Sequence, residues 1–259
     1  MNFGRILVIA TNVFREVIRD RILYIIGLYA LILAGAIWFL PQLAATTEDK
    51  IFLDLGLAAM SLLGLIVAVF IGTGLINKEI EKRTVLVLIA KPISRGEFVT
   101  GKHLGLSAVI AVLITAMTAI YLTFMQLGSV AYPLGSIVLA AVFLFLQLSL
   151  MTAVAITFGV FTSSVLATLL SFGVYLMGNF TQDLVALGRL SESVDVQRMT
   201  RGLYLFLPDL SRLDLKNQAV YGMAVLPNPI ALVANAGYGL LYTGLLLAIA
   251  TLIFSRRQF

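Results

Sequence analysis

Long uncharged apolar stretches recur along the chain, and their lengths predict a helical membrane protein. A membrane-spanning helix needs about 20 mostly apolar residues to cross about 30 Å of hydrocarbon. Six stretches have about that length or more: Ile22–Leu40, Leu55–Ile76, Leu104–Gln126, Leu134–Phe161, Ser163–Phe180 and Ile230–Phe254. The pattern therefore predicts an all-α polytopic protein with a single transmembrane domain over residues 1–259 and six transmembrane helices.

The fourth and fifth stretches form one nearly continuous uncharged run. That run is too long for one membrane crossing and suits two, so we place a boundary at Thr162-Ser163-Ser164. A re-entrant loop at this position is the alternative interpretation.

The N-terminal segment, residues 1–21, has the spacing of an amphipathic helix. Between Asn2 and Asp20, apolar residues recur at helical intervals: Phe3, Ile6, Leu7, Ala10, Val13, Phe14, Val17 and Ile18. Polar and mainly basic residues occupy the other side: Arg5, Asn12, Arg15, Glu16 and Arg19. A helix of this type lies in the membrane interface, where its arginines meet anionic lipid. It either serves only as an anchor or also contacts a cytoplasmic partner.

Composition agrees with a membrane protein and excludes several classes of site. Of the 259 residues, 60% are hydrophobic and 12% are charged, whereas soluble domains carry about 25% charged residues. The chain has no cysteine and one histidine, His103, which excludes disulfides, thiolate chemistry and a polyhistidine metal site within one chain. The net charge of +5 reflects loop lysines and arginines more readily than nucleic-acid binding.

Basic residues outside the apolar stretches predict the orientation, because lysine and arginine accumulate on the cytoplasmic side. They gather before the first stretch, between the second and third, and after the sixth: Arg5, Arg15, Arg19 and Arg21; Lys78, Lys82, Arg83, Lys91, Arg95 and Lys102; Arg256 and Arg257. We therefore expect a multi-pass protein of the cytoplasmic (inner) membrane with both termini in the cytoplasm. We expect no cleavable signal peptide.

None of the 18 basic and 13 acidic residues lies inside the six stretches. Ion-coupled carriers and voltage sensors keep ionisable side chains within the bilayer for function, and intramembrane hydrolases need an acid–base or metal group there. The pattern therefore disfavours all three classes. Active transport by this chain would need an energy source on a separate protein, so we expect no enzyme activity in the chain itself.

Residues Gly96–His103 match most of the phosphate-binding pattern G-x-x-x-x-G-K-[ST]. The final position is histidine, which cannot supply the magnesium-binding hydroxyl, and no βαβ unit surrounds the stretch. We interpret Gly101 and Lys102 instead as the entry to the third membrane helix.

The segment Asn77–Lys102 predicts two helices separated by a break. Its first part is charged and then apolar over Val85–Ala90, and Pro92 ends any helix. Ser94, followed three residues later by Glu97, predicts a capping box at the start of the next helix. The apolar run predicts contact with a groove in a partner or with the headgroup layer.

This segment resembles the second cytoplasmic segment of the type-2 permeases of ATP-binding-cassette (ABC) transporters. The matching residues are Glu79, Glu81, Thr84, Pro92, Ser94, Arg95, Gly101 and Lys102. Family members often carry glycine before the threonine, where this chain has Arg83, so the local turn differs there. The stretch Leu207–Asp214 is similar to the branch that includes the permease of nitrous-oxide-reductase maturation.

The resemblance implies a permease homodimer that binds two copies of a soluble ABC ATPase. ATP and Mg²⁺ would then be held by the ATPase, and this chain would carry no cofactor. The implied coupling residues are Glu79, Glu81, Lys82, Arg83, Thr84, Pro92, Ser94 and Arg95; a solvated charged face is the alternative for them. The implied function is an exporter of unidentified substrate. A membrane scaffold that relays ATPase closure without moving solute, and a passive channel or secondary carrier, are the alternatives.

Residues Thr181–Pro229 form an extracytoplasmic insertion between the fifth and sixth stretches. Apolar residues at Leu184, Leu187 and Leu190 predict a helix with an apolar edge, and Pro208 ends the next piece. We expect an amphipathic cap on the outer leaflet that gates the exit, or a dock for an extracytoplasmic partner. Pro227-Asn228-Pro229 predicts the start of the last membrane helix.

Overall fold

The computed structural model describes residues 2–20, 22–43, 48–81, 94–191 and 193–256, and every regular element in those ranges is helical. The longer helices are α1 (Phe3–Asp20), α2 (Ile22–Leu43), α3 (Glu48–Glu81), α5 (Arg95–Leu127), α6 (Leu134–Phe161), α7 (Ser164–Asn179), α8 (Thr181–Leu190), α9 (Val194–Phe206) and α11 (Pro229–Arg256). Short helical turns η1 (Leu210–Arg212), α10 (Lys216–Ala219) and η2 (Met223–Val225) lie between α9 and α11.

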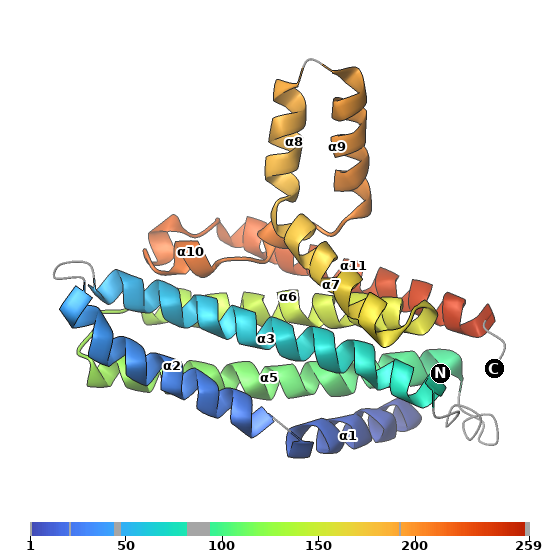
Figure 1. Ribbon diagram of the computed structural model, residues 1–259, viewed down its shortest axis with the longest axis horizontal. Coiled ribbons are helices and arrows are strands. Elements are labelled where there is room, and N and C mark those ends of the chain that lie inside the picture. The colour runs from blue at the N-terminus through green and yellow to red at the C-terminus, as the bar shows by residue number, and fades with distance from the viewer. Residues whose placement is uncertain (1, 21, 44–47, 82–93, 192, 257–259) are drawn as a thin grey trace.

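Helices α2, α3, α5, α6 and α11 are long and apolar enough to cross a membrane. Helix α7 joins this set only as a pair with α8, which is bent by 60° from it. In Figure 1, α2, α3, α5 and α6 run side by side, and the α8–α9 hairpin stands out from the bundle. The all-α polytopic fold is confirmed, with five spans, or six if the bent pair counts as one.

The boundary placed at Thr162-Ser163-Ser164 agrees with the structure. Helix α6 ends at Phe161 and α7 begins at Ser164. The Thr162 N–H donates to the Phe158 carbonyl at 3.0 Å, which closes the last turn of α6. The start of α11 also agrees: Pro229 is its first residue, and the Asn228 side chain accepts a hydrogen bond from the Ala231 N–H at 2.7 Å, an arrangement typical of a helix N-terminus.

Glycines on α3 let this central helix approach α5 and α6 closely. A Cβ atom added at Gly64 would lie 2.4 Å from the Leu148 side chain, and one added at Gly72 would lie 2.9 Å from the Ala155 Cβ. Membrane helices gain little from hydrophobic burial between them, so small residues at close contacts supply packing instead. The Ala155/Gly159 pair serves this contact within the chain, because a Gly159 Cβ would lie 3.3 Å from the Thr73 carbonyl.

Helix α1 packs alongside the first half of α5. Its buried residues Ile6, Val13 and Val17 face the bundle, while Arg15 and Arg19 are exposed. The predicted amphipathic helix is therefore present. Its position in the lipid headgroup layer stays a prediction.

Helix α7 stops near the middle of its neighbour α6. Its 16 residues span about 24 Å, less than the hydrocarbon thickness of about 30 Å. At its last residue, the Asn179 side chain accepts a hydrogen bond from Gln147 at 3.4 Å, and Gln147 lies close to the midpoint of α6. The insertion fills the space beyond: Leu210, Leu213 and Ala219 are buried.

Candidate functional site

The structure positions the two ends of the coupling segment but not its centre. Glu79 and Glu81 belong to the last turn of α3. Ser94 precedes α5, and Arg95 is the first residue of α5. Lys82, Arg83, Thr84 and Pro92, together with the apolar run Val85–Ala90, lie outside the described residues. The coupling roles therefore stay predictions.

The capping box predicted at the start of α5 is present. The Ser94 hydroxyl accepts from the Glu97 N–H at 3.2 Å, and the Glu97 carboxylate accepts from the Ser94 N–H at 3.0 Å. These bonds use two N–H groups that the first turn of a helix cannot satisfy internally. They fix the direction in which the chain leaves the coupling segment.

The same carboxylate also holds the N-terminal helix. Glu97 is 4% exposed, and its second oxygen accepts from the Asn2 backbone N–H at 2.6 Å. The Arg5 guanidinium lies 4.0 Å from Glu97. Below this contact, Gly101 and Gly105 of α5 admit α1 so closely that a Cβ at Gly105 would lie 2.6 Å from the Ala10 carbonyl oxygen.

Arg95 makes the matching connection to the other end of the chain. Its guanidinium donates to the Phe254 carbonyl and lies 5.8 Å from the centre of the Phe254 ring. The Phe98 ring stacks on Phe254 with centroids 5.6 Å apart, and the Lys102 ammonium lies 5.5 Å from the Phe98 centroid. We call the cluster of Ser94, Arg95, Glu97 and Phe98 with Asn2 and Phe254 the α5 joint.

The stretch that resembles a phosphate-binding loop lies inside α5. Gly101, Lys102 and His103 are buried within the helix, where backbone N–H groups bond to carbonyls four residues earlier. Those N–H groups cannot cradle a phosphate. His103 Nε2 instead lies 3.0 Å from the Ser149 carbonyl of α6. Among the residues that the structure describes, no group of three or more His, Asp and Glu side chains could hold a metal ion.

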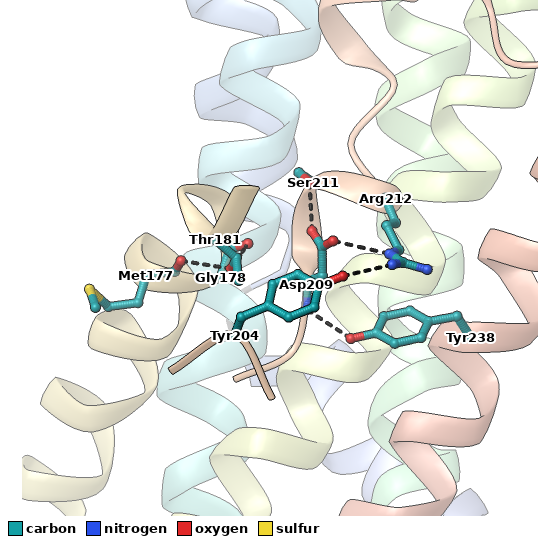
Figure 2. A network of polar contacts seen from close by, with 8 residues as sticks. All are labelled: Met177, Gly178, Thr181, Tyr204, Asp209, Ser211, Arg212 and Tyr238. Carbon is teal, nitrogen blue, oxygen red and sulfur yellow. Dashed lines mark hydrogen bonds and ion pairs between the residues drawn. The ribbon is translucent and has the colours of Figure 1, made fainter. Parts of the chain in front are cut away.

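A second polar cluster, at the base of the insertion, was not predicted as a site. The Asp209 carboxylate accepts from the Ser211 hydroxyl at 2.5 Å and from Arg212 Nε at 3.0 Å, and the Asp209 N–H donates to the Tyr238 hydroxyl at 2.8 Å. Arg212 also donates to the Tyr204 hydroxyl at 3.0 Å. Figure 2 shows these side chains converging from α9, η1 and α11. We call Tyr204, Asp209, Ser211, Arg212 and Tyr238 the insertion node.

The node places charged groups at the depth of the membrane helices. Asp209 is 3% exposed and follows Pro208, whose carbonyl would lie 2.7 Å from a Cβ at Gly178 of α7. An isolated charge at this position would be costly, and pairing with a hydrogen-bonded partner offsets that cost. Arg212 is that partner, because its Nε donates to the Asp209 carboxylate at 3.0 Å.

The end of α7 is built to turn the chain at the same level. The Thr181 hydroxyl donates to the Gly178 and Met177 carbonyls at 2.8 and 2.9 Å, as Figure 2 shows. The prediction that the six apolar stretches contain no charged residue concerned those stretches alone, and the charged residues of the insertion node lie outside them. A sequence signal was present, since Leu210, Leu213 and Leu215 alternate with charged residues between them.

Comparison with known families identifies the chain. The family model described as "ABC-2 family transporter protein" matches residues 7–259. The chain belongs to this family. No curated protein matches the ABC-2 protein at a significant level. The family match agrees with a multi-pass ABC-2 permease, a membrane component that is generally not catalytic itself. The nitrous-oxide-reductase maturation branch stays a prediction.

Proposed function

We propose that this ABC-2 protein is the permease subunit of an ATP-driven exporter, acting as a homodimer with two copies of a soluble ABC ATPase. The family match supports a transporter component. The observation that carries the coupling mechanism is the α5 joint, because it connects the coupling segment to both ends of the chain.

The lengths of α3 and α5 are compatible with helices that extend beyond the membrane next to the coupling segment. These helices have 34 and 33 residues, or about 50 Å each at 1.5 Å per residue. The hydrocarbon layer is about 30 Å thick. Both helices are therefore long enough to continue beyond it, and the end of α3 at Glu81 and the start of α5 at Arg95 flank the coupling segment.

Displacement of this segment would move three helices together. Ser94 and Glu97 attach it to α5, Glu97 attaches α5 to α1 through Asn2, and Arg95 attaches α5 to Phe254 of α11. Helix α11 then continues to Tyr238 in the insertion node. ATP-driven closure of the ATPase pair would bias the permease between two forms if the ATPase binds the coupling segment differently in each. In this proposal Glu79, Glu81, Lys82 and Arg83 supply charged docking contacts.

In the proposed orientation, the α5 joint lies on the cytoplasmic side of the inner membrane. Helix α1 begins, α11 ends, α3 ends and α5 begins at one end of the bundle (Figure 1). Basic residues collect at that end: Arg5, Lys78, Arg95, Lys102 and Arg256. Lysine and arginine favour the cytoplasmic side, and their proximity to anionic headgroups would stabilise this orientation.

The proposal is tested by purifying the tagged protein from its native membranes and measuring ATP hydrolysis in the eluate. We expect vanadate-sensitive hydrolysis to co-purify, and the double reversal Glu81→Lys with Arg83→Glu to reduce it at least tenfold. The matched control is Asp49→Lys with Lys50→Glu, which exchanges a neighbouring charge pair at the opposite end of α3. The control should retain the activity.

Two results would refute this assignment. Hydrolysis that survives the Glu81/Arg83 reversal would exclude these charges as the docking contact. Accumulation of a solute by the purified chain alone, driven by a proton or sodium gradient, would exclude the ATPase as the energy source. If the ATPase co-purifies and no lipid or drug stimulates it in liposomes, the scaffold function replaces export.

A further inference from the structure

An open cavity lies where the end of α7, the segment 211–218 and the start of α11 meet. Its volume is about 690 Å³, within the range of about 300–1,000 Å³ that is typical of small-molecule sites. Asn179, level with the middle of α6, and Asn235, in the second turn of α11, both line it. The cavity therefore occupies the half of the bundle that is remote from the α5 joint.

One wall of the cavity carries opposite charges side by side. The Lys216 ammonium forms an ion pair with the Asp214 carboxylate, and both residues line the cavity. Arg212, on the same wall, is engaged by Asp209 and Tyr204. The wall thus presents both signs of charge. A ligand with a net charge would find no unpaired opposite charge among the described residues of this wall, and burying that charge in a low-dielectric setting would cost free energy.

The same wall offers an acceptor without a donor. Gln218 Oε1 is buried and has no hydrogen-bond partner among the residues that the structure describes. Leaving such an acceptor unsatisfied costs about 1–3 kcal/mol, and a bound donor would remove that cost. Gln218 lines the cavity, two residues beyond Lys216.

The end of α7 contributes apolar, exposed side chains to the lining. Leu176 and Phe180, at the end of α7, line the cavity, and each is 57% exposed. Both belong to the α7 region, which lies at membrane depth because Asn179 contacts the middle of α6. An apolar rim beside a two-signed polar wall suits an amphiphile, with its head on the wall and its chains along the rim.

We propose that this cavity binds the headgroup of a zwitterionic phospholipid that carries a primary ammonium. The lipid phosphate lies against Lys216, and the ammonium donates to Asp214 and, once the buried Gln218 amide turns toward the cavity, to Gln218 Oε1. The acyl chains leave over Leu176 and Phe180. An anionic headgroup without an ammonium would leave Gln218 Oε1 without a donor and would bring no positive group to the Asp214 carboxylate. The proposal concerns binding alone, so it goes beyond the proposed export function and does not depend on an ATPase.

The experiment uses the full chain in nanodiscs with a diazirine-bearing phosphatidylethanolamine and maps the labelled peptides by mass spectrometry. We expect saturable labelling within residues 175–180 or 211–218, and at least tenfold weaker competition by phosphatidylglycerol than by phosphatidylethanolamine. Gln218→Leu and, independently, Asp214→Asn should each reduce labelling at least fivefold. Gln126→Leu, the same substitution at an exposed site on α5, should leave it unchanged.

Three outcomes would overturn the proposal. They are labelling confined to other parts of the chain, equal competition by phosphatidylglycerol and phosphatidylethanolamine, and unchanged labelling in both cavity variants. A thermal melt of each variant verifies folding, and Asp214→Asn decides the matter if Gln218→Leu fails to fold. Because the assay contains no ATPase, a negative result here leaves the co-purification test intact.

Discussion

The contact of α1 with α5 predicts opposite effects for the same substitution at two glycines. A Cβ at Gly105 would lie 2.6 Å from the Ala10 carbonyl oxygen and 2.7 Å from the Val13 Cβ, whereas carbon atoms in good contact stand about 3.5–4.0 Å apart. Gly105→Ala must therefore push α1 away by roughly 1 Å. At Gly173 in α7, an added Cβ meets no heavy atom within 4 Å in the described part of the chain.

The magnitudes follow from two competing terms. Replacing glycine by alanine inside a helix stabilises it by about 0.5–1 kcal/mol. Overpacking costs about 1–3 kcal/mol, so Gly105→Ala should destabilise the protein by about 1–2 kcal/mol net. At about 2–4 °C per kcal/mol for a chain of this size, Gly105→Ala lowers the Tm by about 2–8 °C and Gly173→Ala raises it by about 1–4 °C.

Scanning fluorimetry of the two purified variants in the same detergent measures these shifts against the parent protein. Exposed bonds in α1 give a second readout, because displacement of α1 should speed tryptic cleavage after Arg15 in Gly105→Ala alone. If Gly105→Ala raises the Tm as Gly173→Ala does, α1 does not pack on α5 as described, and the α5 joint loses its connection to the N-terminal helix.

Two further substitutions test the polar clusters. Glu97→Gln replaces a carboxylate that accepts hydrogen bonds from two backbone N–H groups. Because hydrogen bonds to charged groups contribute about 1.5–3 kcal/mol, we expect the free energy of unfolding to fall by about 2 kcal/mol and tryptic cleavage after Arg5 to become faster. Cleavage no faster than in the exposed control Glu16→Gln would contradict this. Tyr238→Phe removes the acceptor for the Asp209 N–H and should lower the free energy of unfolding by about 1–3 kcal/mol, with faster hydrogen exchange at residues 209–212. The control is Tyr24→Phe, at a side chain on α2 that is 80% exposed. Equal exchange rates in the two variants would refute the role of the insertion node.

Sequence pattern alone was sufficient for five of the membrane helices and for the starts of α5 and α11. The apolar stretches predicted the spans, because each helix must satisfy its own backbone hydrogen bonds in lipid and therefore needs a minimum apolar length. The Ser94/Glu97 capping box and the start of α11 at Pro229 depend on residues within one turn of each other. Such short-range signals can be recognised from the sequence alone.

The partners of those helices depended on the tertiary structure. Glu97 accepts a hydrogen bond from the Asn2 N–H, 95 positions away, and Arg95 donates one to the Phe254 carbonyl, 159 positions away. No local sequence pattern predicts which distant backbone group such a side chain contacts. The shortness of α7 and the entry of residues 209–220 into the bundle were likewise decided in three dimensions. A charged segment can occupy that depth only when a complementary set of groups surrounds it, and here those groups come from α9 and α11, which only folding brings together.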